Sequence, residues 1–147
     1  MKKFKFDLEK VLSVREKELE SINLEVTECL HHVKLKEQEI ERLRQDIVMI
    51  QDERSKKLAM TMTSQALKPL IFKEESVQLK LDTSQKELIE LHEQSKRLLM
   101  KRQNKKTEVN SLEKLKERQK NEYDLHALKQ EEAFIESLWN RKNDSKR

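Results

Sequence analysis

Four histidines and a single cysteine are the residues of this sequence best suited to binding a metal. Cys29 and His32 are three residues apart, which would put two zinc ligands on one face of a helix. His31 and His32 would not share a face, because adjacent residues of a helix point about 100° apart. Cys29 also falls in an apolar repeat, where a small hydrophobic side chain is expected. The sequence therefore predicts no metal site and no cofactor.

Pairs of carboxylates four residues apart are frequent in the sequence and would share helix faces. Acid–base catalysis by such a pair needs a concave, partly dry site that separates the two pKa values. Two long helices packed side by side provide no such cavity. We therefore expect no catalytic residues and no enzymatic activity, and we interpret Asp and Glu as solvating side chains.

Basic residues cluster at 101–106, at Arg141 and Lys142, and at Lys146 and Arg147. Binding to nucleic acid would use such charges to neutralise phosphates. Acidic residues interrupt the basic clusters, and aromatic residues, which stack on bases, make up only 4% of the chain. The sequence therefore favours proteins over nucleic acids as partners.

The composition favours long solvated helices. Of 147 residues, 41% are charged and only 35% are hydrophobic, which is too little for a large closed core. Glycine is absent and Pro69 is the only proline, so tight turns and phosphate-binding loops are not expected. The formal charge of +4 is a small excess of 32 basic over 28 acidic side chains. Cys29 is alone, so no internal disulfide is expected.

The N-terminal segment Met1–Asp7 has basic residues but lacks the apolar stretch of about 7 to 15 residues found in signal peptides. No run in the sequence approaches the roughly 20 apolar residues of a membrane span. We expect a cytoplasmic protein without direct membrane insertion.

An apolar repeat with alternating steps of four and three residues begins at Leu8. A strict repeat of this kind keeps one stripe on one side of a helix, and such a stripe demands a partner helix. The exceptions to its apolar character are Arg15, Lys36 and Arg54. The positions are Leu8, Leu12, Arg15, Leu19, Ile22, Val26, Cys29, Val33, Lys36, Ile40, Leu43, Ile47, Ile50 and Arg54.

A second apolar repeat follows a stretch rich in hydroxyl residues near Thr63 and Ser64, either of which could cap a new helix. Pro69 is expected in the first turn of that helix. The positions of this repeat are Leu70, Glu74, Val77, Leu81, Ser84, Leu88, Leu91, Ser95, Leu98, Arg102, Lys105, Val109 and Leu112. The sequence predicts an all-α fold, a single antiparallel two-helix coiled-coil hairpin with a projecting C-terminal helical end. Its expected parts are helix 5–58, turn 59–67, helix 68–141 and a basic tail 142–147.

Folding the chain back near Thr63 brings Leu8 roughly opposite Arg118 and gives each charged interruption an oppositely charged partner. Charges at such positions mainly fix register and partner choice. The expected pairs are Arg15 with Glu108 or Glu113, Lys36 with Glu87 or Glu90, Arg54 with Glu74 or Glu75, and Arg102 and Lys105 with Glu18, Glu20 or Glu25.

The second helix has no expected partner beyond about residue 122, and its last 20 or so residues would extend about 30 Å as a lone helix. An aromatic cluster of Trp139 with Phe134, Ile135 and Leu138 lies on that segment. A large aromatic residue on an unpartnered helix is typical of an interface anchor. The alternatives are a second helix–helix contact in a homodimer and a frayed end. Lys2, Lys3 and Lys5 make the same end basic, which favours an acidic protein partner.

Both ends of the chain resemble the FliJ family, the coiled-coil component of the flagellar type III export apparatus. The start of the sequence has the aromatic residues Phe4 and Phe6, then Leu8, Val11, Leu12 and Arg15 followed by acidic residues. The segment 112–118, followed by Glu122 and Tyr123, resembles the usual ending of the second helix of that family. The two-helix layout and length also match.

The resemblance implies a non-enzymatic stalk and adaptor similar to the central stalk of rotary ATPases. The end formed by both termini would insert into the ring of the hexameric export ATPase. The positions implied for that contact are Phe6, Leu8, Val11, Leu12, Arg15, Leu112, Leu115, Arg118 and Tyr123, to which the argument from the lone helix adds Trp139.

The resemblance also implies that the bent end lies toward the cytoplasmic domain of the export gate, at the cytoplasmic face of the inner membrane at the flagellar base. The apolar candidates for this contact are Ile47, Ile50, Leu70, Ile71 and Phe72. Export chaperones are further expected partners, and the isolated chain is expected to be monomeric. Two alternatives stay open: the equivalent stalk of a virulence secretion system, and a structural scaffold that self-associates in parallel through Leu12–Ile47.

Overall fold

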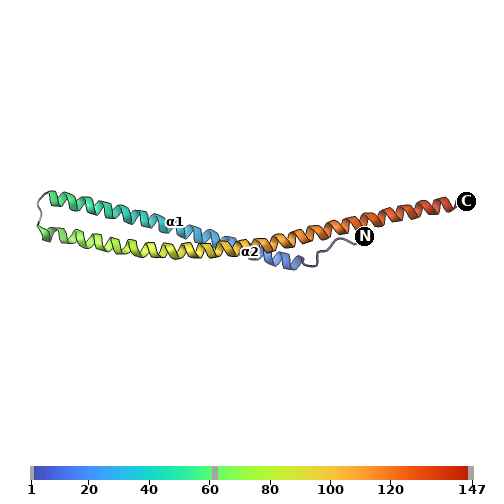
Figure 1. Cartoon of the computed structure of the whole chain (residues 1–147), viewed down its shortest axis with the longest axis horizontal. Coiled ribbons are helices and arrows are strands. Elements are labelled where there is room, and N and C mark those ends of the chain that lie inside the picture. Colours follow the sequence, from blue (N-terminus) through green and yellow to red (C-terminus); the bar gives the residue numbers. More distant parts are fainter. Residues whose placement is uncertain (1, 61–62, 146–147) are drawn as a thin grey trace. The chain divides into compact units, whose positions relative to one another are not determined.

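A computed structural model describes residues 2–60 and 63–145. Two long helices, α1 (Glu9–Ala59) and α2 (Ser64–Ser145), pack against each other in a helical hairpin (Figure 1). No strand occurs in the described part of the chain. The all-α hairpin predicted from the two apolar repeats is confirmed.

The chain divides into two compact units that each contain parts of both helices. One unit, Ile22–Arg102, holds the bend, and we call it the bend unit. The other combines Met1–Ser21 with Gln103–Arg147, and we call it the terminal unit.

The interior of the bend unit is built from the predicted repeats. Nearly all its buried side chains are apolar, and all of them occupy positions of the steps of three and four, so that each helix presents one stripe to the other. Cys29 is buried among them as a free thiol, and its Sγ lies 3.8 Å from the carbonyl oxygen of Leu91. The buried residues are Ile22, Val26, Cys29, Val33, Ile40, Ile50, Leu70, Leu81, Ser84 and Ser95.

Ion pairs across the bend unit confirm the predicted register. Lys36 pairs with Glu87 on α2, and Arg54 pairs with Glu74. The hydrogen bonds that Lys36 donates to Glu87 and Glu39 hold the pKa of its amine above the usual value. Lys36 and the weaker bond from the Ser84 hydroxyl correspondingly lower the pKa of Glu39. Each cationic interruption of the α1 stripe therefore meets a carboxylate rather than an apolar surface.

The terminal unit has a core made by segments from opposite ends of the sequence. Phe6, Leu12 and Val109 are buried together. Around them pack the partly buried side chains of Phe4, Leu19, Leu112 and Leu115. This cluster joins the start of the chain to α2, as the predicted hairpin requires.

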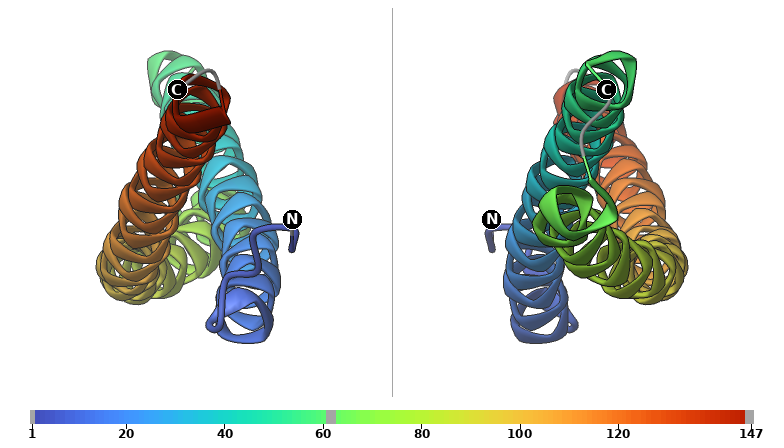
Figure 2. Two further views of the ribbon diagram at one scale, coloured as in Figure 1. Left: turned by 90° about the vertical axis from the view of Figure 1, so that its right-hand side faces the viewer. Right: turned by 90° about the vertical axis from the view of Figure 1, so that its left-hand side faces the viewer.

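The expectation that the first helix begins near residue 5 is wrong, because residues 2–6 are not helical and α1 begins at Glu9. Figure 2 shows this change from irregular chain to helix at the N-terminal end. The Glu9 amide donates to the Phe6 carbonyl at 3.1 Å, which closes a turn just before the helix. From this irregular segment Phe4 packs against Tyr123 of α2, with ring centroids 5.7 Å apart.

The second helix also departs from the predicted bounds, since α2 begins at Ser64 rather than near residue 68. The Ala66 amide donates to the Thr63 carbonyl at 3.0 Å, so Thr63 is at the N-cap position. Pro69 therefore lies inside the second turn, and its predicted place in the first turn is wrong. Its ring removes only the bond to the carbonyl of Gln65, an exposed residue whose carbonyl water can reach. Thr61 and Met62 of the predicted turn 59–67 lie outside the described residues.

At its other end α2 continues to Ser145, past the predicted end at residue 141. Lys142 in the last turn favours this continuation, because a cation near a helix C-terminus interacts well with the helix dipole. Residues 142–145 of the predicted basic tail are therefore helical, and Lys146 and Arg147 lie outside the described residues. Every residue from Leu128 to Ser145 is exposed, and we call this stretch the C-terminal extension.

Candidate partner-binding surfaces

Five of the residues assigned to a ring contact pack inside the terminal unit instead of facing outward. Leu12 is only 3% exposed and Phe6 is also buried, so both side chains are occupied by the core. Leu112, Leu115 and Tyr123 are partly buried, and Tyr123 lies against Phe4. The structure brings these residues together, but they form the core that holds the two chain segments side by side and not a surface for a partner.

Arg15 sits at the centre of an ion-pair network in the same unit. Its guanidinium lies 3.1 Å from Glu18 and 3.7 Å from Glu108, and the Lys105 amine lies 2.7 Å from Glu18. Hydrogen bonds from Lys105 and then Arg15 lower the pKa of the Glu18 carboxyl. Bonds to Glu18 and then Glu108 raise the pKa of Lys105. The charges thus hold the register of the terminal unit, which matches the predicted pairing.

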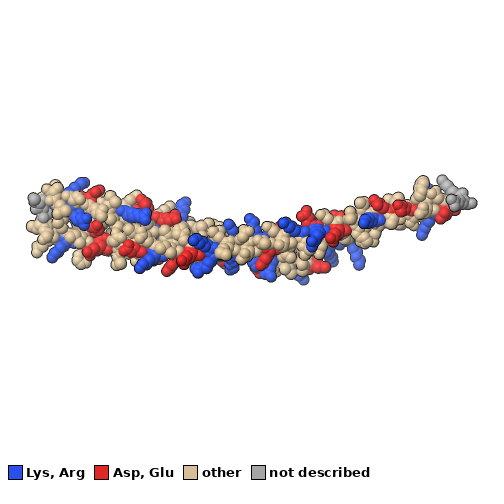
Figure 3. Space-filling model, in the orientation of Figure 1, with Lys and Arg blue, Asp and Glu red and all other residues tan. Residues whose placement is uncertain are grey.

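The remaining assigned residues at this end are available to a partner. Leu8, just before α1, and Val11, in its first turn, are exposed, and Arg118 is exposed on α2. Arg118 lines a shallow hollow with Lys114 and Leu125. Lys and Arg alternate with Asp and Glu on the face seen in Figure 3, so the surface is mixed in charge rather than uniformly basic.

Trp139 is 65% exposed on the C-terminal extension. Phe134, Ile135 and Leu138 are exposed beside it, so the predicted aromatic cluster forms a continuous apolar surface on an unpartnered helix. Leu125 and Leu128 are also exposed on α2, separated from this cluster by the polar residues 129–132. Single exposed apolar residues are ordinary, but a group on one helix face marks an interaction site.

Near the bend, the five candidates for a gate contact also divide into buried and exposed residues. Ile50 and Leu70 are buried and Ile47 is half-buried, so these three hold α1 against α2. Ile71 is exposed, and Phe72 is 76% exposed. Of the five candidates, only this adjacent pair has side chains exposed enough to contact a partner.

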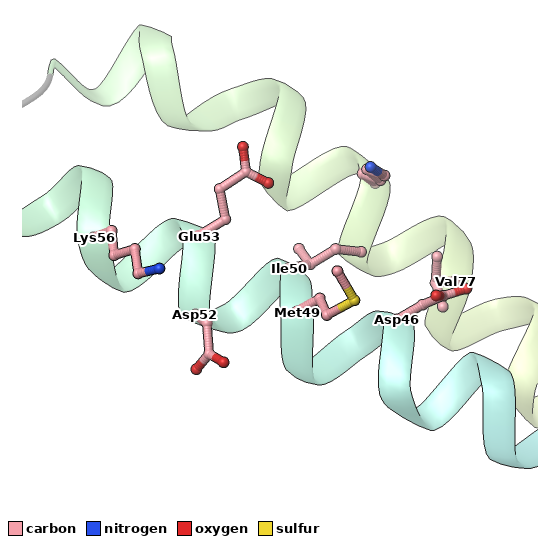
Figure 4. A pocket seen from close by; sticks show the side chains of 8 residues that line it. Asp46, Met49, Ile50, Asp52, Glu53, Lys56 and Val77 are labelled. Carbon is pink, nitrogen blue, oxygen red and sulfur yellow. The ribbon is translucent and has the colours of Figure 1, made fainter.

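A groove of about 530 Å³ lies between α1 and α2 in the bend unit. In Figure 4, Ile50 extends from α1 toward α2 and Asp52 points away from it. Met49 and Val77 line the groove with Ile50, and charged side chains form the rest of the lining. The sequence reasoning missed Met49 and Val77 as groove residues. Val77 belongs to the predicted repeat, but Met49 does not, and only its position beside Ile50 signals its role.

Across residues 2–60 and 63–145 no cluster of three or more His, Cys, Asp or Glu side chains could hold a metal ion. His32 lies 3.8 Å from Glu28, and His92 lies 3.9 Å from Glu37, both as exposed side chains. Neither helix, over its described residues, contains an apolar stretch long enough for a membrane span.

The fold and its surfaces define a helical hairpin with exposed apolar groups on the C-terminal extension and near the bend. Comparisons with protein-family models, with curated proteins and with solved structures gave no match.

Proposed function

We propose that this chain is a non-enzymatic stalk and adaptor of the bacterial flagellar type III export apparatus. In this role it binds the hexameric export ATPase through the terminal unit and the cytoplasmic domain of the export gate through the bend unit. It acts at the cytoplasmic face of the inner membrane, at the flagellar base, and it also escorts export chaperones. ATP hydrolysis belongs to the partner.

One observation supports this proposal above the others. The two segments that resemble the FliJ family, at residues 4–18 and 112–123, are far apart in the sequence but share one core in the terminal unit. Their packing leaves Leu8, Val11 and Arg118 outward. An ATPase ring that contacts both segments at once would bind this combined surface. Neither segment alone would present it.

The experiment measures ATP hydrolysis by the purified export ATPase with and without this chain. The stalk role predicts faster hydrolysis and more ring assembly in the presence of the chain. Replacing Leu8 and Val11 together by Ser should abolish the stimulation, because it removes exposed apolar contacts without touching the buried core. Leu24→Ser is the control, since Leu24 is also an exposed apolar residue of α1 but lies in the bend unit.

The gate contact has its own test in the bend unit. Phe72→Ser should weaken binding of the chain to the gate's cytoplasmic domain at least tenfold, because a large exposed aromatic side chain contributes about 2 kcal/mol or more when it anchors an interface. Leu24→Ser again serves as the control, because Leu24 is about as exposed as Phe72 but is not among the candidate residues near the bend. Unchanged hydrolysis with the wild-type chain and unchanged gate binding with Phe72→Ser would together overturn the proposal.

A further inference from the structure

The C-terminal extension carries a charge pattern that is complementary to itself. Its apolar cluster, Phe134–Trp139, is flanked by acidic residues on one side, Glu131 and Glu132, and by basic residues on the other, Arg141 and Lys142. Two such helices laid antiparallel place the acidic flank of each beside the basic flank of the other. We propose that the extension is a docking surface for a second copy of this chain, in a two-fold symmetric antiparallel pair.

Spacing along the extension fixes which residues meet. Glu132, Ile135, Trp139 and Lys142 follow steps of three, four and three, so they form one narrow stripe on the helix. With the two-fold axis level with Ser137, Trp139 of one copy lies beside Ile135 of the other. Glu132 lies beside Lys142 of the second copy on both sides of these central apolar layers. A two-fold contact uses one patch twice, so each favourable contact occurs twice.

The flanks of the stripe complete the apolar centre. Leu138 lies next to the stripe and, near the axis, faces Leu138 of the second copy. Leu138 and Ile135 are both exposed in the single chain, so burial against a second copy removes apolar surface from water. Glu136 of the two copies face each other at the opposite, wet flank, and this like-charge contact limits the affinity.

The second copy does not compete with the chain's own N-terminal segment. In this register Ser145 of one copy lies level with Lys129 of the other. Phe4 contacts α2 at Tyr123, well before that level. The stretch that the second copy would cover, from Lys129 to Ser145, is exposed in the single chain.

The charges of the extension are free to make these contacts. Within the described part of the chain, Glu132 and Lys142 form no ion pair with another described side chain. The terminal-unit hairpin, by contrast, pairs Lys105 with Glu18 and Lys116 with Glu9. The charged side chains of the extension are thus available for cross-helix ion pairs of the kind that hold the hairpin together.

The overlap spans about 25 Å of helix, so the area that it buries is smaller than that of a standard interface. We therefore expect a weak dimer with a dissociation constant of about 10 to 100 µM. At concentrations well below that range the chain is monomeric, in line with the expectation from sequence. The dimer hides Trp139, so self-association competes with any other partner of that residue. The dimer itself does not depend on the proposed stalk role.

Sedimentation equilibrium of the full chain between about 1 and 500 µM tests the proposal. Glu132→Lys should weaken the dimer at least tenfold, because it sets two lysines against each other at both ends of the contact. Lys142→Glu should do the same. The double variant Glu132→Lys with Lys142→Glu exchanges the charges and should restore the wild-type dissociation constant to within about threefold.

Asp144→Lys is the matched control, because it changes the net charge as much as Glu132→Lys but lies on the opposite side of the helix from the stripe. It should leave the dissociation constant within about twofold of wild type. Glu136→Gln should tighten the dimer about twofold by removing the like-charge contact.

A second measurement reports the geometry directly. In a Cys29→Ala background, Leu138→Cys should form a disulfide-linked dimer under mild oxidation, whereas Asn140→Cys, on the outer face, should not. A chain that stays monomeric at 500 µM, or a dimer insensitive to both charge reversals, would overturn the proposal. The latter result would point instead to a dimer through Leu12–Ile47. Loss of ATPase stimulation would not bear on it.

Discussion

Leu12 shows how a residue from a motif can serve the fold before it serves a partner. It is buried with Phe6 and Val109, and its side chain ties the first turn of α1 to α2. Leu24, by contrast, is 72% exposed on the same helix. Substitutions at the two leucines therefore compare how much a buried and an exposed apolar side chain contribute to the free energy of unfolding.

Leu12→Ala should lower the free energy of unfolding by about 2 to 4 kcal/mol, because it removes buried methyl groups and leaves a cavity. Leu24→Ala should change it by less than about 0.5 kcal/mol. Urea unfolding followed by helical circular dichroism measures both. Equal effects of the two substitutions would show that Leu12 does not pack in a core.

Glu18 gives the molecule a defined response to acid. Its folded-state pKa is lowered by Lys105 and Arg15, so it contributes stability above its unfolded pKa and loses that contribution as the pH falls through the folded value. We expect the thermal midpoint of the wild type to exceed that of Glu18→Gln near pH 7. The difference should shrink as the pH falls through the lowered folded-state pKa of Glu18, because protonation makes the two side chains alike in charge. A constant difference across that range would contradict the assigned ion pair.

At the level of the helices, the start of α2 is where local chemistry and tertiary packing disagree. Pro69 sits in the second turn although proline disfavours helix interiors. The next residue, Leu70, is buried, and Ala66 and Leu67 are half-buried, so packing against α1 holds this turn in helical form. The helix survives here because burial outweighs one missing hydrogen bond.

Pro69→Ala should therefore stabilise the protein by about 1 to 3 kcal/mol, since it restores the bond to the Gln65 carbonyl and removes the steric conflict. The gain should be local, and amide exchange of residues 64–72 should slow most. Lys68→Ala, at the neighbouring exposed position, should change the stability by less than about 0.5 kcal/mol.

The sequence was sufficient to predict the helices and their pairing, because the repeats from Leu8 and Leu70 and the charges at Lys36 and Arg54 each restrict the register. It did not predict the irregular segment before Glu9, where Phe4 and Phe6 pack without a helix. Helix propensity cannot reveal this, because the packing partner Tyr123 is distant in the sequence. It also did not separate buried candidates such as Ile50 from exposed ones such as Phe72, since both are apolar residues near the bend.

For the molecule as a whole, the antiparallel pairing of α1 and α2 within one chain is the property that every proposed contact requires. A parallel dimer would instead bring Lys36 beside Lys36 of another chain. The intramolecular pair of Lys36 with Glu87 distinguishes the two arrangements.

Lys36→Glu should lower the thermal midpoint, because it places a carboxylate beside Glu39 and Glu87. Adding Glu87→Lys should recover most of the loss by exchanging the charges. Circular dichroism at about 1 µM, where a weak dimer is dissociated, measures both. No recovery in the double variant would contradict the intramolecular register. A strong dependence of the midpoint on concentration below about 5 µM would contradict a single-chain hairpin.

The spacing of the cross-helix ion pairs also has a mechanical consequence. If α1 slid along α2 by one heptad, the apolar stripes would match again, but Lys36 would face Lys80 or Gln94 instead of Glu87. Arg15 would face Lys101 or Leu115 instead of Glu108. Each unit therefore resists shear in both directions, because every slipped register leaves a cation unpaired or against another cation. An axial force on one helix is therefore transmitted to the other helix instead of making the two helices slide past each other.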